Sequence, residues 1–167
     1  MAVIFQVILV SAYPQEKSKK QLKEEERQKK MQQIETLINS KDFIFVARYA
    51  LPMGKRQIDL TSNPNYVKFN PEQFDGYMPF FGEATSGIGY GADQTIKFRD
   101  KPETYTIEKK KKNYQVDAKV KGENDIYRLS LSVTFEGSAS LSIVSNHRNT
   151  ISYQGEIMPE GSWKSRK

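Results

Sequence analysis

The sequence predicts a mainly β protein, an antiparallel meander of about eight to ten strands that forms a barrel or a sandwich, with one N-terminal α-helix. First, almost every second residue is apolar between Tyr105 and Ile157, in segment after segment. Successive strand side chains point to opposite faces, so this period of two indicates half-buried strands. Second, short segments of turn-forming residues separate these runs, and no helical pattern interrupts them. Because open sheet edges promote aggregation, we expect the strands to close into a barrel or to form two packed sheets.

The helix is expected to end near Ser40, because the residues from Gln15 onward are strong helix formers and Asn39 and Ser40 are not. Four apolar residues spaced three or four positions apart should dock on the core: Met31, Ile34, Leu37 and Ile38. Between residues 16 and 30 only Leu22 is apolar, so this stretch cannot bury a face. We therefore expect a charged lead-in over residues 13–33 that is helical or disordered.

The first strand is expected at Phe43–Ala50, and its apolar residues on both faces favour a central position in the sheet. Turns at Pro52–Gly54 and Asn63–Asn65 imply antiparallel neighbours. The β domain is expected to span residues 34–158, with a flexible tail at 159–167. Further strands are predicted at Arg56–Thr61, Tyr66–Phe69, Thr95–Arg99, Thr104–Glu108, Tyr114–Lys121, Tyr127–Phe135, Ala139–Val144 and Thr150–Ile157.

Composition excludes several classes of chemistry. The 167 residues include no cysteine, which rules out disulfides, thiolate metal sites, a cysteine nucleophile and a lipid anchor attached through cysteine. The net charge of +6 would suit a polyanion, but the basic residues are dispersed among glutamates or lie in the hairpin turn at Lys109–Lys112. The single histidine, His147, lies in a turn without further metal ligands. We therefore expect no nucleic-acid partner, no metal and no cofactor.

The first twelve residues have the composition of an export signal. Ala2–Val10 is apolar except for Gln6, and Val10-Ser11-Ala12 offers a small-residue cleavage site after Ala12. No basic residue precedes the apolar run, so a buried N-terminal strand remains the alternative. The run is shorter than the ~20 residues of an ordinary spanning helix. We expect a periplasmic or secreted protein with no transmembrane span in the mature chain.

The least regular part of the predicted domain runs from Tyr77 to Gln94, first rich in aromatic residues and then in glycine. Long irregular loops often carry function. One interpretation is a flap over a pocket mouth, where four aromatic side chains bind a small apolar or sugar-like ligand: Tyr77, Phe80, Phe81 and Tyr90. The alternative is that these aromatic side chains cap the core.

Signals for catalysis are weak. A Ser-His-Asp site would have to use His147, and no nucleophile-elbow pattern accompanies the serines. Acid pairs such as Asp59 with Glu83, or Asp93 with Asp117, would serve a glycosidase only if the fold placed them about 5 to 9 Å apart. We therefore assign no catalytic residue.

Several sequence blocks, taken in order, resemble domain-of-unknown-function family 4251, a group of small exported proteins found mainly in Bacteroidetes. After a short apolar leader, the blocks are LINSKDF at 37–43, ALPMG at 50–54, IDL at 58–60, YMPFFG at 77–82, GSASLS at 137–142 and ISYQG at 151–155. The resemblance covers about Ile34 to Ile157. It implies a cell-envelope or secreted location and transfers no catalytic residue.

We therefore expect an uncharacterised exported envelope protein that acts as a noncatalytic small-ligand-binding or accessory module. One alternative is a hydrolase that uses acidic residues near the 82–94 loop, and another is a structural module that binds an envelope protein through a sheet edge. A binder predicts a pocket with a few convergent polar groups, whereas an enzyme predicts convergent titratable residues with perturbed pKa values. An edge binder predicts an exposed unpaired strand and a filled core.

Overall fold

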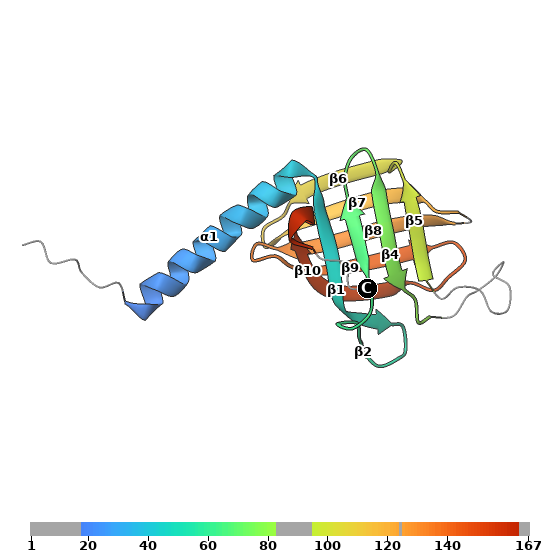
Figure 1. The fold of residues 1–167 in the computed structure, drawn as a ribbon, viewed down its shortest axis with the longest axis horizontal. Helices are drawn as coiled ribbons and strands as arrows, with labels where there is room; N and C mark the ends of the chain where they lie inside the picture. The colour runs from blue at the N-terminus through green and yellow to red at the C-terminus, as the bar shows by residue number, and fades with distance from the viewer. Residues whose placement is uncertain (1–17, 83–94, 124, 164–167) are drawn as a thin grey trace, which may run out of the picture.

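The computed structural model describes residues 18–82, 95–123 and 125–163 (Figure 1). The predicted export signal at 1–12 and the loop at 83–94 lie outside the described residues. In chain order, the elements are α1 (Lys19–Ser40), β1 (Phe43–Pro52), β2 (Ile58–Asp59), β3 (Tyr66–Phe69), β4 (Phe74–Pro79), β5 (Thr95–Asp100), β6 (Thr104–Lys109), β7 (Asn113–Lys121), β8 (Ile126–Thr134), β9 (Ser138–Ser145), β10 (Ile151–Met158) and the short 3-10 helix η1 (Glu160–Ser162).

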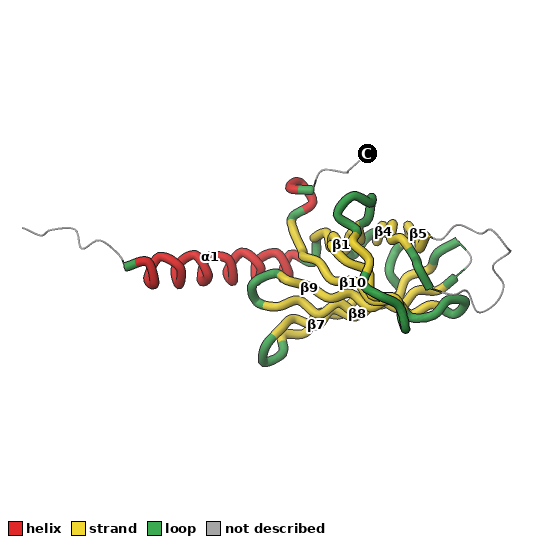
Figure 2. The backbone as a smooth tube through the Cα atoms, turned by 90° about the horizontal axis from the view of Figure 1, so that it is seen from below, coloured by secondary structure: helices red, strands yellow, loops and turns green. Residues whose placement is uncertain are grey.

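The strands form one antiparallel sheet in the order β5-β4-β3-β1-β10-β9-β8-β7-β6, with β2 beside β1. This sheet curls into a half-barrel, in which the half that contains β1, β3, β4 and β5 crosses over the half that contains β6 to β9 (Figures 1 and 2). The predicted mainly β, antiparallel fold is confirmed. The predicted central position of the first strand is also confirmed, because β1 lies between β3 and β10.

Most predicted strands lie within a residue or two of the observed ones, but β4 was not predicted. Its sequence, FDGYMP, contains Gly76 and Pro79, and both residue types weaken a strand pattern. In the sheet, the ring of Phe98 on the neighbouring strand β5 covers Gly76, where a Cβ atom would lie 2.2 Å from a ring carbon. A side chain distant in the sequence thus fills the space that glycine leaves open.

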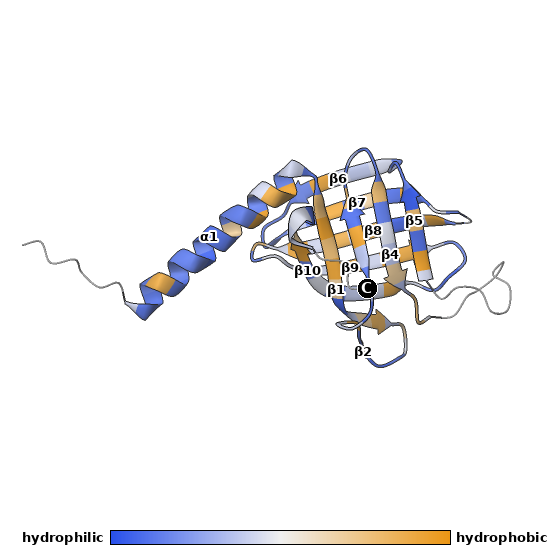
Figure 3. Ribbon diagram, viewed as in Figure 1, coloured by the Kyte–Doolittle hydropathy of each residue, from blue (hydrophilic) through white to orange (hydrophobic). Residues whose placement is uncertain are grey.

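The concave side of the half-barrel is a packed core rich in aromatic rings. Phe43 and Phe69 stack with centroids 5.0 Å apart, and Phe74 meets Phe69 edge-on at 5.1 Å. Tyr105 closes this group with an edge contact to Phe74 at 5.0 Å. Apolar and polar residues alternate along the strands that build it (Figure 3). Such rings contribute about 0.5–1.5 kcal/mol per pair beyond the burial of their area.

Helix α1 packs its apolar residues on the core through its C-terminal part, and its N-terminal part projects away (Figure 1). Between these parts, Arg27 Nε lies 2.7 Å from Glu136 Oε1 in the turn between β8 and β9. Ile34 and Ile38 are buried and Leu37 packs against the core, as their spacing predicts. A capping box between Ser18 and Gln21 satisfies the first turn of the helix. Among the residues that the structure describes, no helix is both long enough and apolar enough to cross a bilayer.

Candidate ligand-binding site

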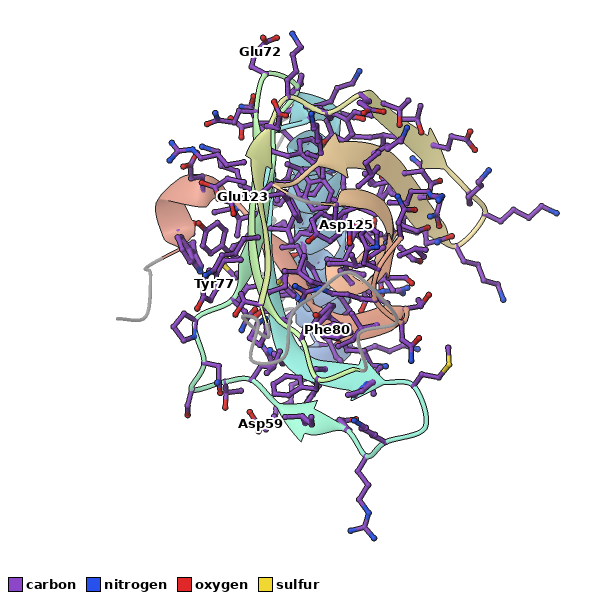
Figure 4. All side chains as sticks on the ribbon, turned by 90° about the vertical axis from the view of Figure 1, so that its right-hand side faces the viewer. Asp59, Glu72, Tyr77, Phe80, Glu123 and Asp125 are labelled. Carbon is purple, nitrogen blue, oxygen red and sulfur yellow. The ribbon has the colours of Figure 1, made fainter. Side chains whose placement is uncertain are left out.

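The aromatic residues proposed from the sequence lie in different environments. Along β4 the buried side chains alternate with Tyr77, which therefore faces the outside, whereas Phe80 is buried with 4% of its surface exposed. Figure 4 shows Tyr77 on the outer side of the sheet and Phe80 between its two halves. Phe81 is partly buried against the core, and Tyr90 lies outside the described residues. Tyr77 and Phe80 thus face opposite sides of the sheet.

Phe80 follows β4 directly and is part of the buried core of the half-barrel. The Arg148 guanidinium lies 5.1 Å from the centroid of its ring, a cation–π distance. Nearby, the buried Tyr153 hydroxyl donates a hydrogen bond of 2.8 Å to the carbonyl of Pro79. These contacts hold the segment after β4 against the core.

A β-bulge between Ala47 and Tyr49 breaks the alternation of β1. Ala47 faces the core and the inward pattern resumes at Ala50, so Arg48 and Tyr49 both avoid the core. A bulge places two residues opposite one on the partner strand and redirects their side chains. The outer face of β1 therefore carries a basic and an aromatic side chain in succession.

The buried amide of Asn65 holds this bulge in place. The Ala47 N–H donates a 2.7 Å hydrogen bond to Asn65 Oδ1, at a point between the segments of β1 that pair with β3 and with β2. Asn65 Nδ2 in turn donates to the carbonyls of Leu60 and Asn63, at 3.3 and 3.1 Å. One side chain thus replaces the missing backbone ladder and fixes the loop over residues 60–65.

The bulge, this loop and the C-terminal segment surround a groove of about 600 Å³ on the outer face, here called the outer groove. On its floor, Arg48 Nη2 lies 2.8 Å from Glu156 Oε1. Among the residues that line it are Val46, Tyr49, Asn63, Pro64, Met158 and Trp163. The outer groove therefore offers hydrogen-bond donors and acceptors beside apolar and aromatic surface.

Trp163 forms one wall of the outer groove, a position that the sequence does not reveal. Its ring lies 4.8 Å from that of Tyr66 on β3, measured between centroids, at an interplanar angle of 54°. An ion pair of 2.7 Å between Lys68 Nζ and Glu160 ties the preceding helix η1 to the same strand. The C-terminal segment consequently lies over the outer side of the half that contains β1 and β4 (Figure 2). The predicted tail covered residues 159–167, and 159–163 are the part that the structure describes.

A second groove, of about 420 Å³, lies on the outer face at β4 and β5 and is lined by Tyr66 and Tyr77. Lys97 Nζ lies 5.4 Å from the centroid of Tyr77, and the Tyr66 hydroxyl donates a 3.0 Å hydrogen bond to Asp75 Oδ1. Arg99 Nε approaches the other Asp75 oxygen at 3.9 Å. Tyr66 thus lines the second groove and also packs on Trp163 of the outer groove.

Tyr66, on the outer face, should make the free energy of unfolding depend on pH in alkaline solution. Burial, reinforced by the hydrogen bond to Asp75, raises the pKa of Tyr66 from 10.0 to about 12. The unfolded chain releases this proton near pH 10, whereas the folded protein keeps it until about pH 12. The free energy of unfolding should therefore be retained below pH 10 and fall between pH 10 and about 12.

Urea unfolding across this range should show a shallower decline for Tyr66→Phe than for the unchanged protein. Burial also raises the pKa values of Tyr105 and Tyr153, so these residues supply a background decline common to both proteins. Identical slopes would show that Tyr66 titrates normally.

The acids considered for hydrolysis have local structural roles where the structure describes them. Asp59 accepts hydrogen bonds from the Thr61 hydroxyl and N–H at 2.6 and 2.7 Å, which hold the pKa of Asp59 below its usual value. Asp117 accepts from the Ser130 hydroxyl at 2.7 Å. Glu83 and Asp93 lie outside the described residues. Within the three described ranges, no group of three His, Asp or Glu side chains is arranged to hold a metal ion.

The single histidine lies near a serine and an aspartate, but not in relay geometry. The Ser145 hydroxyl donates its hydrogen bond directly to Asp125, and the backbone N–H of His147 donates to Ser145 Oγ at 3.1 Å. Asp125 also accepts from the backbone of Ile126 and Asn146, at 2.7 and 3.1 Å. The carboxylate therefore joins the β7–β8 and β9–β10 connections, and the arrangement does not activate the serine through the imidazole.

The fold and the candidate site define the class of protein: a β half-barrel with an N-terminal helix and grooves on its outer face. The family model for the domain of unknown function DUF4251 matches residues 25–157. The chain belongs to this family, which confirms the resemblance found in the sequence. A crystal structure of a DUF4251 family protein from Bacteroides eggerthii has a similar fold, with a TM-score of 0.65 and 17% identity over 80% of this chain and 90% of that one. No curated protein matches the chain.

Proposed function

We propose that this protein is an exported, noncatalytic binding module of the cell envelope that takes its ligand in the outer groove. The observation that carries the proposal is the bulge in β1, which Asn65 fixes from within and which turns Arg48 and Tyr49 to the outside. Without the bulge, β1 would keep an uninterrupted ladder of backbone hydrogen bonds with its neighbours. Bulges are typical of positions where a strand redirects side chains for function.

The character of the outer groove supports binding rather than catalysis. Trp163 and Tyr49 offer aromatic surface, and the Arg48–Glu156 pair offers both a donor and an acceptor. Small-molecule sites commonly combine apolar walls with a few fixed polar groups. The filled aromatic core on the concave side supports a site on the outer face instead of inside the half-barrel.

Support for export comes from the N-terminal sequence and from the character of the family it resembles. The apolar run Ala2–Val10 and the small residues up to Ala12 are typical of a cleaved signal, and we propose a periplasmic or secreted location.

Native mass spectrometry of the full chain, produced in a Bacteroides host and purified gently from the cell envelope, tests both parts. We expect a polypeptide mass that begins at Tyr13, together with a defined additional mass that denaturation removes. A matched Trp163→Ala sample should keep the processed N-terminus and the strand signature in circular dichroism but lose the additional mass. An unprocessed chain would contradict export, and a bare processed chain would contradict ligand binding.

A further inference from the structure

We infer that the outer groove and the second groove form one continuous site for an uncharged oligosaccharide that crosses the strands. This inference rests on the proposed function, because it names the ligand class of the same groove. Three observations carry it: the ring contact between Trp163 of the outer groove and Tyr66 of the second groove, the balance of charge in both grooves, and their position on the outer side of the sheet.

The two grooves adjoin at the contact between Tyr66 and Trp163. The Tyr66 ring packs on Trp163 of the outer groove and its side chain lines the second groove, where Tyr77 follows on the next strand. The site crosses β1, β3, β4 and β5, which are neighbours in the sheet. Adjacent strands lie about 4.8 Å apart, so the three intervals span about 14 Å. This length suits several linked sugar units rather than one ring.

The aromatic side chains along this path suit sugar rings. Trp163, Tyr66 and Tyr77 present apolar ring surfaces with polar groups beside them, such as Asp75 on the Tyr66 hydroxyl and Lys97 over Tyr77. A sugar ring has a C–H face that packs on an aromatic ring and hydroxyl groups at its edge that need hydrogen-bond partners. Tyrosine and tryptophan supply both an apolar body and a polar handle.

The charges along the path balance. The outer groove holds one basic and one acidic side chain, Arg48 and Glu156, and the second groove holds three of each. A site for a polyanion needs an excess of basic residues. Hydroxyl groups both donate and accept hydrogen bonds, so a neutral polyol matches an equal supply of cations and carboxylates.

Along β1, β3 and β4 the proposed site lies on the face of the sheet, away from the free edge that the usual mode of peptide capture needs. An extended peptide gains affinity by adding a strand to a free edge. The outer groove and the part of the second groove at Tyr66 and Tyr77 lie on the outer face of β1, β3 and β4, whose backbones already pair with neighbours on both sides. The second groove extends further onto β5, the terminal strand of the sheet. Recognition over β1, β3 and β4 must use side chains, as it does for a sugar.

The single tryptophan of the chain makes the test direct, because Trp163 is its only indole fluorophore. The intact protein is titrated to millimolar concentration with neutral hexasaccharides (cellohexaose, xylohexaose, mannohexaose and maltohexaose), with the matching disaccharides and with hexagalacturonate. We expect a saturable fluorescence change with at least one neutral hexasaccharide and at least tenfold weaker binding of its disaccharide.

Tyr77→Ala separates the continuous site from a single groove. It should weaken binding of the hexasaccharide about tenfold, or ~1.4 kcal/mol, and leave the disaccharide unchanged, because the shorter ligand occupies only the outer groove. Val144→Ala, an exposed change on β9 in the other half of the sheet, is the control and should alter neither affinity.

Each other outcome overturns a defined part. Equal binding of hexasaccharide by Tyr77→Ala and by the unchanged protein overturns the continuous site. A response to hexagalacturonate alone overturns the neutral ligand class. No response to any neutral hexasaccharide overturns the inference while an additional mass on the envelope-purified protein still supports the proposed function, and the absence of both overturns both.

Discussion

Replacement of Gly155 by alanine should destabilise the protein by about 3 kcal/mol or more, or prevent folding. A Cβ atom at this position would lie 2.0 Å from the carbonyl oxygen of Val46 and 2.8 Å from the Cα of Ala47. Both are backbone atoms of β1 beside the bulge, so no side-chain rotation can relieve the clash. Urea unfolding followed by circular dichroism measures the loss.

Gly161→Ala is the matched control, because a Cβ atom there would meet no atom within 4 Å. We expect its free energy of unfolding to stay within about 0.5 kcal/mol of the unchanged protein. Equal stability of the two alanine variants would mean that β1 and β10 do not approach each other as closely as described.

Asn65→Ala should lower the free energy of unfolding by about 2–3 kcal/mol. The change leaves the Ala47 N–H without its acceptor and removes the amide donor from the carbonyl of Asn63, at a site where Asn65 is only 4% exposed. The Leu60 carbonyl loses one of two donors and keeps the 3.0 Å hydrogen bond from the Asn63 N–H. Buried polar groups that lose their partners cost about 1–3 kcal/mol each, and partial entry of water offsets part of this sum. Chemical denaturation gives the magnitude.

Asn63→Ala tests whether the effect belongs to the buried amide or to the loop in general. Asn63 is the same residue type two positions earlier and is exposed, so we expect a change within about 0.5 kcal/mol. The proposal for Asn65 also predicts that amide NMR signals of the 60–65 loop shift widely in Asn65→Ala and only locally in Asn63→Ala. A reversed order of the two effects would remove Asn65 as the anchor of the bulge.

Elements that follow from a local pattern of apolar residues could be predicted from the sequence. The alternation between Tyr105 and Ile157 predicts β6 to β10 because one face of β7 to β10 is buried and one face of β6 is partly buried, and burial then follows every second residue. The spacing of Ile34 and Ile38 predicts the docked part of α1 in the same way. β4 escapes such reasoning, because its weak position at Gly76 is filled by Phe98 from another strand.

The candidate site was harder to predict because it also depends on contacts between residues that are distant in the sequence. Tyr77 was found through its aromatic neighbours, but Arg48 and Tyr49 come together only because β1 bulges. Strict alternation would have placed them on opposite faces. The bulge depends on Asn65 and on the space left by Gly155, two residues that are distant from it in sequence and carry no motif. Contacts between distant residues thus build the site, and no local pattern reports them.

The C-terminal segment follows the last core strand, β10, and forms one wall of the outer groove. Among its described residues, η1 buries no side chain, and the segment attaches to the sheet through Lys68–Glu160 and Trp163–Tyr66. Substitutions in this segment therefore leave the packing of the half-barrel intact. In the proposed site, the floor at Arg48 and Tyr49 is tied to the fold, whereas a substitution after β10 would alter one wall of the outer groove and leave the half-barrel unchanged.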